Sequence, residues 1–214
     1  MSAELFAQLA AARIVPVVEI TDANTAVDLA RALLAGGLPV MEVTLRTPAA
    51  LGAIRAIRAE VEGFIVGAGT LLSPGQIAAA SAAGAHFGVS PGFTPTLSAA
   101  ATDLGLPFLP GTVTASEILA AAELGHTHLK FFPAEQSGGA AAIASLAAPL
   151  AGLGISFMPT GGIRPAGLGD YLRLPSVFAV GGTWIAPRDA ITEGRFEEIL
   201  AATQAAVASA SLFS

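Results

Sequence analysis

A repeating order of helix, glycine and short apolar strand constrains the fold of this 214-residue chain more than any other feature. Gly63, Gly84, Gly105 and Gly125 follow one another at intervals of 20 or 21 residues, and an apolar segment begins within three residues of each. Glycine after a helix supplies the left-handed residue that closes it. The pattern therefore predicts strands that alternate with helices, which is typical of a parallel sheet.

Eight such strands are predicted along the chain. They cover residues 15–19, 40–45, 65–68, 87–90, 108–109, 128–132, 157–160 and 177–180, with a short helix over 165–172 and a final helix over 191–210. Eight alternating units in about 200 residues favour a single (β/α)8 TIM barrel over residues 1–214, with a short extra helix before the first strand. A doubly wound sheet is the alternative, but the Gly-rich loop that usually follows its first strand is missing after Glu19.

Hydroxyl side chains mark several helix starts. Thr47 and Thr94 each precede a proline, which predicts an N-cap with proline in the first helical turn. Thr114 and Glu117 have the spacing of a capping box.

Composition excludes some classes of function. Only 12% of the residues are charged and the net charge is -6, so no nucleic-acid partner is expected. The absence of cysteine excludes disulfides and thiolate metal sites. The two long stretches without charge are interrupted by Gly, Pro, Ser and Thr, which argues against a membrane span. The N-terminus lacks the basic region of a signal peptide, so the expected location is the cytoplasm.

The second predicted strand carries polar side chains on one face. Because strand side chains alternate, Glu42, Thr44 and Arg46 share a face, and the apolar residues between them share the other. The apolar face must meet the helices, so the polar face points inward. An internal salt bridge that only packs the barrel would explain the same pattern.

The sixth predicted strand holds Lys130, the only lysine against nine arginines. A charged ammonium in an apolar strand is costly unless it is neutralised or paired. Arginine serves elsewhere in the chain wherever a positive charge is wanted, but only lysine can form an imine. The alternative is a lysine whose stem is buried at the barrel mouth while its amine reaches water. We interpret Lys130 as a catalytic amine that forms an imine with a small keto acid.

Glycines end the seventh and eighth strands, at Gly161, Gly162, Gly181 and Gly182. Backbone amides at these two strand ends commonly bind phosphate in barrels, although two tight turns would need glycine as well. The three histidines lack metal-ligand spacing, so no metal site is predicted, and they are read as structural or core residues.

Several segments together closely resemble the KDPG aldolase family, the 2-dehydro-3-deoxy-phosphogluconate aldolases. The segments begin at Glu42 (Glu-Val-Thr-Leu-Arg-Thr), Gly67 (Gly-Ala-Gly-Thr), Ser90 (Ser-Pro-Gly), Lys130 (Lys-Phe-Phe-Pro-Ala-Glu), Pro159 (Pro-Thr-Gly-Gly) and Val180 (Val-Gly-Gly-Thr-Trp), and they run in order over nearly the whole chain. Thr183 stands where the family usually has serine, which keeps the hydroxyl.

The resemblance implies cleavage of a phosphorylated keto acid to pyruvate and glyceraldehyde 3-phosphate, without metal or organic cofactor, by a homotrimer. It implies that Lys130 forms the Schiff base and Glu42 is the general acid/base. The other implied roles are carboxylate binding by Arg46 and Thr70, the wall around the imine from Pro91 and Phe132, hydroxyl contacts from Thr160, and phosphate binding by Gly161, Gly162, Gly182 and Thr183.

Three alternatives remain open. A 4-hydroxy-2-oxoglutarate aldolase would use the same imine on a substrate without phosphate. A non-catalytic phosphosugar-binding barrel and a phosphosugar isomerase would both use the paired glycines, but neither explains the position of Lys130.

Overall fold

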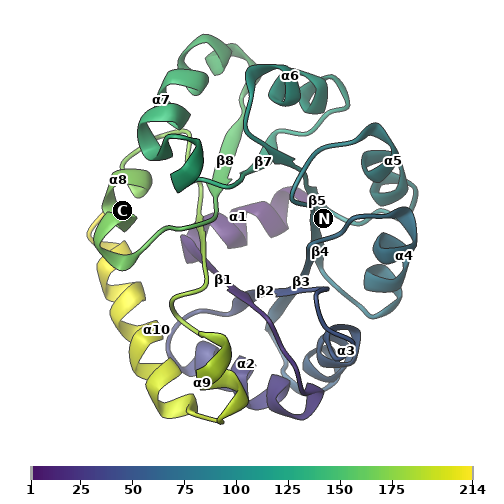
Figure 1. Cartoon of the computed structure of the whole chain (residues 1–214), viewed down its shortest axis with the longest axis vertical. Coiled ribbons are helices and arrows are strands. Elements are labelled where there is room, and N and C mark those ends of the chain that lie inside the picture. The colour runs from purple at the N-terminus through teal and green to yellow at the C-terminus, as the bar shows by residue number, and fades with distance from the viewer. Residues whose placement is uncertain (1, 214) are drawn as a thin grey trace.

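Parallel strands in the centre and helices around them make up the fold (Figure 1). The computed structural model describes residues 2–213. Its strands are β1 (Ile14–Val18), β2 (Val40–Thr44), β3 (Ile65–Gly69), β4 (Phe87–Val89), β5 (Phe108–Leu109), β6 (Gly111–Thr112), β7 (His128–Phe131), β8 (Ser156–Pro159) and β9 (Val180–Gly182). Its helices are α1 (Ser2–Ala12), α2 (Ala26–Ala35), α3 (Ala50–Glu60), α4 (Pro74–Ala82), α5 (Pro95–Asp103), α6 (Ala115–Glu123), α7 (Gly139–Leu150), α8 (Leu168–Leu172), α9 (Arg188–Thr192) and α10 (Phe196–Ser211). Short 3-10 turns cover Ala23–Thr25, Glu135–Ser137, Ala151–Leu153 and Pro165–Gly167.

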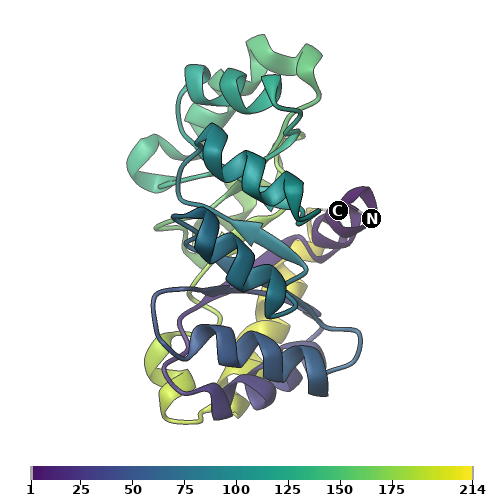
Figure 2. The same cartoon turned by 90° about the vertical axis from the view of Figure 1, so that its right-hand side faces the viewer.

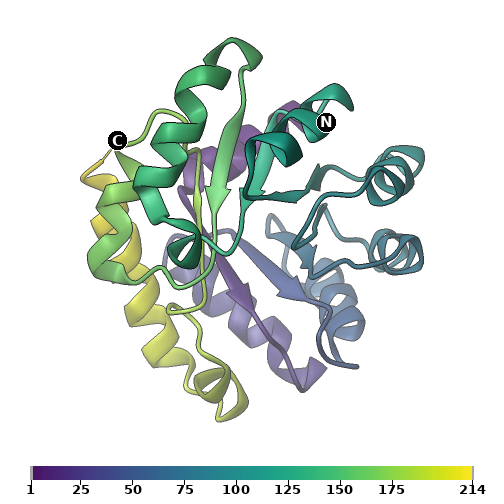
Figure 3. The ribbon, with the colours of Figure 1, turned by 45° about the horizontal axis from the view of Figure 1, so that its top comes forward.

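The strands pair in two separate sheets rather than in one closed ring (Figure 3). Six strands have the order β5-β4-β3-β2-β1-β9, and three have the order β6-β7-β8. Between β8 and β9 only isolated bridges occur, at Phe157 with Val177 and at Thr160 with Gly181. The predicted closed eight-stranded (β/α)8 barrel is therefore wrong, although strands and helices alternate as an α/β fold requires.

Pro110 accounts for one of the two breaks. The predicted strand at residues 108–109 ends at this proline, which has no N–H to donate. Before it, the Leu109 carbonyl accepts a hydrogen bond from Ser90 on the β4 side, at 3.2 Å. After it, the Pro110 carbonyl accepts from Lys130 of β7, at 2.9 Å. The chain thus changes partner at Pro110, and β6 is a strand that the sequence pattern did not predict.

The last predicted helix also differs from the observed one. The sequence predicts one helix over residues 191–210, but α9 ends at Thr192 and α10 begins at Phe196. Gly194 between them has a φ of 68°, a left-handed conformation that interrupts a right-handed helix. The short helix over 165–172 is observed as the turn Pro165–Gly167 followed by α8.

Apolar side chains form two layers of core, one inside the strands and one between strands and helices. Inside, Leu5 and Leu9 of α1 pack with Val15, Val40 and Met158 from three strands. This packing places α1 across the amino ends of the strands, where Figures 1 and 2 show it lying against them. The opposite, carboxyl ends of the strands are left free for a site. Of the helices between residues 2 and 213, none combines the length and apolar character needed to cross a bilayer.

Candidate active site

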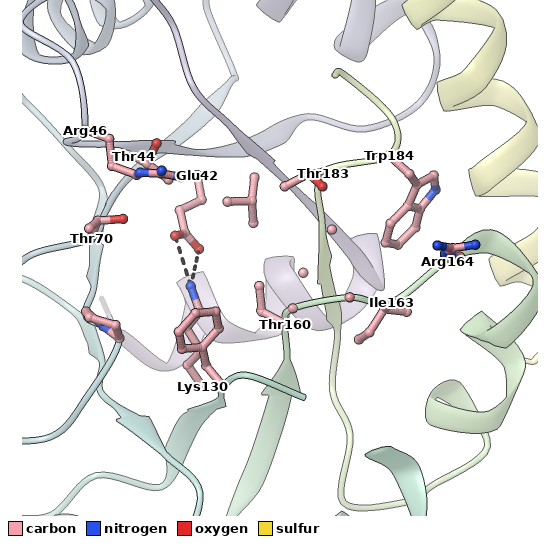
Figure 4. A pocket seen from close by; sticks show the side chains of 17 residues that line it. Glu42, Thr44, Arg46, Thr70, Lys130, Thr160, Ile163, Arg164, Thr183 and Trp184 are labelled. Atoms are coloured by element: carbon pink, nitrogen blue, oxygen red, sulfur yellow. Dashed lines mark hydrogen bonds and ion pairs between the residues drawn. The ribbon is translucent and has the colours of Figure 1, made fainter. Parts of the chain in front are cut away.

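A cavity of about 540 Å³ opens at the carboxyl ends of the strands (Figure 4). All of the residues that the sequence singled out for a site line this one cavity. They are Glu42, Arg46, Thr70, Pro91, Lys130, Phe132, Thr160, Gly161, Gly162, Gly182 and Thr183. The structure therefore brings together residues that lie as far apart as 42 and 183 in the chain.

Lys130 and Glu42 meet at the bottom of the cavity. The Lys130 side chain is 7% exposed and the Glu42 side chain is fully buried, and Lys130 Nζ donates to Glu42 Oε1 at 3.2 Å and Oε2 at 3.5 Å. Nζ lies 5.4 Å from the centroid of the Phe132 ring. Strand alternation on β2 and β7 points both side chains inward, as the sequence predicted. The pair provides an amine and a carboxylate in direct contact, between which a proton can move.

Glycine at position 69 makes room for the Glu42 carboxyl group. A Cβ atom built on Gly69 would overlap Glu42 Oε1, and one on Gly67 would overlap the Phe87 ring. Gly69 pairs with Thr44, so β3 lies directly against the strand that carries Glu42. Close packing therefore explains both glycines of this segment, against the buried Glu42 carboxylate at Gly69 and against the Phe87 ring at Gly67.

Arg46 lies at the mouth of the cavity in a small ion cluster. Its guanidinium lies 3.2 Å from Glu19 Oε2, and Arg188 lies 2.8 Å from Glu19 Oε1. Both arginine side chains are 64% exposed, whereas Glu19 is 17% exposed. Thr44, beneath Arg46 on β2, donates its hydroxyl to the Val18 carbonyl at 3.0 Å. Sequence reasoning missed Glu19, although it stands at the end of the first strand, where inward polar residues gather.

Thr70 holds a strained backbone conformation beside the cavity. Its φ is 58°, in the left-handed region that β-branched residues rarely adopt. Such strain persists where the surrounding structure enforces it, and it is concentrated at functional sites. Figure 4 shows Thr70 on the same side of Lys130 as Arg46 and Thr44.

Glycines shape the other end of the cavity. Gly161 and Gly162 have φ values of 108° and 78°, which favour glycine. A Cβ on Gly181 would overlap Thr160 Oγ1, and one on Gly182 would overlap the Trp184 ring. The four glycines leave backbone exposed to the cavity next to Thr183, which is the arrangement expected of a phosphate site.

Histidines lie outside this cavity. Burial lowers the pKa of His126 and of His128, and burial followed by the nearby Arg58 charge lowers that of His86. His128 stacks on Phe6 of α1, with ring centroids 4.2 Å apart. Between residues 2 and 213 no group of three His, Asp or Glu side chains is placed to hold a metal ion.

Comparison with known proteins places the chain in a family. Residues 5–202 match the family model described as KDPG and KHG aldolase. The chain belongs to this aldolase family. The resemblance seen in the sequence motifs is thereby confirmed, and the family is one of carbon–carbon lyases.

Individual family members are similar over almost the whole chain. The KHG/KDPG aldolase of Escherichia coli (strain K12) is 46% identical over 199 residues, which cover 93% of this chain and 92% of the relative. A solved KDPG aldolase from Legionella pneumophila, with pyruvate captured as a covalent carbinolamine intermediate, has a TM-score of 0.89 at 38% identity, covering 94% of this chain and 96% of its own. The aldolase of Zymomonas mobilis ZM4 with 3-phosphoglycerate has a TM-score of 0.88 at 40% identity and 97% coverage of both chains.

Proposed function

We propose that the protein is a class I aldolase that cleaves 2-dehydro-3-deoxy-6-phosphogluconate to pyruvate and D-glyceraldehyde 3-phosphate. One observation carries the proposal: in a member of the KDPG and KHG aldolase family, the sole lysine projects a buried amine into the strand-end cavity, in contact with Glu42. The carbinolamine captured in the Legionella pneumophila relative supports the same chemistry.

The first stage makes the imine. Nζ of Lys130, after transfer of its extra proton to Glu42 along the hydrogen bond of 3.2 Å, attacks the C2 carbonyl of the substrate. The carbinolamine that results loses its hydroxyl as water, with a proton supplied by Glu42. The product is a cationic iminium, which is the electron sink for the next stage.

The second stage breaks the C3–C4 bond. The C4 hydroxyl gives its proton to the Glu42 carboxylate, the C3–C4 electron pair moves into the iminium, and glyceraldehyde 3-phosphate leaves. The enamine on Lys130 then takes a proton at C3, and water hydrolyses the iminium to release pyruvate. Because the water lost at the first stage is taken up again here, the overall reaction is a simple cleavage, and the steps use no organic cofactor.

The remaining residues bind and orient the substrate in this proposal. The carboxylate of the keto acid takes a charge-assisted, bidentate position on Arg46, with Thr70 beside it. Such positioning is a large part of rate enhancement. The other assignments are the wall around the imine (Pro91 and Phe132), the substrate hydroxyls (Thr160) and the phosphate (Gly161, Gly162, Gly182 and Thr183).

Borohydride trapping tests the imine. Wild-type protein with pyruvate and borohydride should gain the mass of pyruvic acid less one oxygen atom, at one site per chain, and peptide mapping should find that site at Lys130. The Lys130→Arg variant keeps the positive charge and should gain no mass and show no turnover. Modification of both proteins to the same extent, or of neither, would contradict the proposal.

A second substrate is supported by a specific observation. The Escherichia coli relative is named for both KHG and KDPG, so 4-hydroxy-2-oxoglutarate is a candidate substrate with the same imine and no phosphate. Comparing kcat/KM for the two substrates decides which one the cavity favours.

We also propose that the protein forms a homotrimer. Charged residues are scarce at 12%, and large apolar side chains such as Leu72 and Leu124 are 61% and 51% exposed. A homotrimer would bury part of this exposed apolar surface. Light scattering after size exclusion should give about three times the 21.3 kDa chain mass.

A further inference from the structure

Arg164 is a cation at the glycine-rich end of the cavity to which the sequence assigned no role. It follows Gly161, Gly162 and the buried Ile163, and it lines the cavity together with Thr183 and Trp184. Figure 4 shows its guanidinium near Trp184, on the far side of the cavity from Arg46 and Thr70. The two arginines therefore lie at opposite ends, with Lys130 and Glu42 between them.

The three cations of the cavity differ in their partners. Lys130 is paired with Glu42, and Arg46 is paired with Glu19. Arg164 has no ion pair with any carboxylate among residues 2–213. Its charge is therefore available to an anion in the cavity.

Local structure keeps Arg164 at this position. The left-handed Gly161 and Gly162 turn the chain after β8, and Ile163, 6% exposed, anchors it in the core. Pro165 then begins the 3-10 turn, with Arg164 extended at φ -115° just before it. Since proline restricts the residue before it to extended conformations, the backbone of Arg164 is held between two fixed points.

We propose that Arg164 is a specificity-determining residue that binds the substrate phosphate and makes the cavity prefer phosphorylated keto acids. The inference rests on the proposed function for the identity of the substrate. A phosphate monoester carries close to two negative charges, which the backbone amides of the glycines bind as dipoles and Arg164 binds as a full charge. An arginine fork also matches phosphate geometry better than a lysine would.

The test compares two substrates with the same carbon skeleton. For Arg164→Gln, kcat/KM for 2-dehydro-3-deoxy-6-phosphogluconate should fall about tenfold, mainly because KM rises. A tenfold fall is at the lower end of what loss of a charge-assisted hydrogen bond causes, because water screens the charge of an exposed side chain. For the unphosphorylated 2-dehydro-3-deoxygluconate it should change less than about twofold. Arg55→Gln removes another exposed arginine, from α3 and outside the cavity, and should change neither value.

A binding measurement keeps the inference separate from the proposed chemistry. Trp184 is the only tryptophan and lines the cavity, so its fluorescence should report binding of glycerol 3-phosphate, which has no keto group. Arg164→Gln should weaken this binding by about tenfold, and added salt should reduce the difference between the proteins. If wild type cleaves neither substrate, the proposed function fails, but weaker glycerol 3-phosphate binding in the variant still supports the role of Arg164. Equal losses on both substrates, or unchanged phosphate binding, would overturn the inference.

Discussion

Removing one member of the Lys130–Glu42 pair should cost more stability than removing both. Lys130→Met keeps most of the length of the side chain but removes the Lys130 amine, which among residues 2–213 is the sole hydrogen-bond donor to a carboxylate that has no exposure to solvent. Breaking a buried pair in this way costs about 3–5 kcal/mol, because a buried charge is left without compensation. For a chain of this size, about 3 kcal/mol corresponds to a fall in Tm of roughly 6–12 °C.

The other single variant and the double variant complete the cycle. Glu42→Leu leaves the Lys130 amine alone, but that amine borders an open cavity and can reach water, so the loss should be smaller than for Lys130→Met. The double variant Lys130→Met/Glu42→Leu places two apolar side chains in an apolar layer. Its stability should return to within about 1 kcal/mol of wild type, as replacing a whole buried pair is often neutral.

Urea unfolding measures these losses, followed by circular dichroism and by Trp184 fluorescence at one protein concentration. Coincident curves from the two probes validate the free energies of unfolding. The reasoning is refuted if Lys130→Met is as stable as wild type, or if the loss in the double variant equals the sum of the two single losses.

Three further changes probe the site and its support. Gly69→Ala should lower kcat on the order of 10²-fold with the fold retained, because the new Cβ displaces the Glu42 carboxyl group. A pyruvate-release assay measures kcat and circular dichroism checks the fold; an unchanged kcat would contradict this prediction. Arg46→Gln should raise KM about tenfold and change kcat less, and an unchanged KM would remove it from carboxylate binding. Burial lowers the pKa of His128, so the folded state favours the neutral ring. The contribution of His128 to stability is therefore fully present above its ordinary pKa of 6.5, and it is lost as the pH falls through the lower pKa of the folded state. Urea midpoints at about pH 7.5 and about pH 5.5 should therefore differ less in His128→Phe, which can still pack on Phe6, than in wild type.

The meeting of the site residues could be predicted because it follows from two simple rules. Alternation along a strand places Glu42 and Lys130 on inward faces, and the carboxyl ends of parallel strands meet at one edge. These rules need only strand positions, and the observed β2 and β7 begin at the predicted residues 40 and 128. The roles assigned to the residues stay predictions until the variants are measured.

The continuity of the sheets could not be read from strand positions. Whether β5 hydrogen-bonds onward to β7 depends on which carbonyl and amide groups face each other around Pro110, and the hydrophobic pattern carries no information on that.

The prediction for Thr47 was wrong for a similar reason. The sequence predicts that Thr47 caps a helix, but its hydroxyl donates to the Ile20 carbonyl, and α3 begins only at Ala50 with no side-chain cap. In both cases a contact between segments distant in sequence overrode a local signal.

The ion pairs at the cavity mouth could not be predicted from the sequence either, because they depend on the positions of side chains from three separate segments. Glu19 follows β1, Arg46 follows β2 and Arg188 begins α9. Their charges suggested no partner when read along the chain.

Several features of the cavity work against stability, and together they indicate selection for chemistry. A buried ion pair is weak support for a fold, since apolar side chains of similar volume often do as well or better. The chain nevertheless keeps its only lysine opposite a fully buried glutamate, and it gives up the side chain at Gly69 so that the carboxylate fits. Thr70, the next residue, holds a left-handed backbone conformation that costs on the order of 1 kcal/mol or more. A salt bridge that only packed the core would require neither the opening to a cavity nor the backbone strain at Thr70. A purely structural role would therefore explain the Lys130–Glu42 pair but not the cavity and the strained residue beside it.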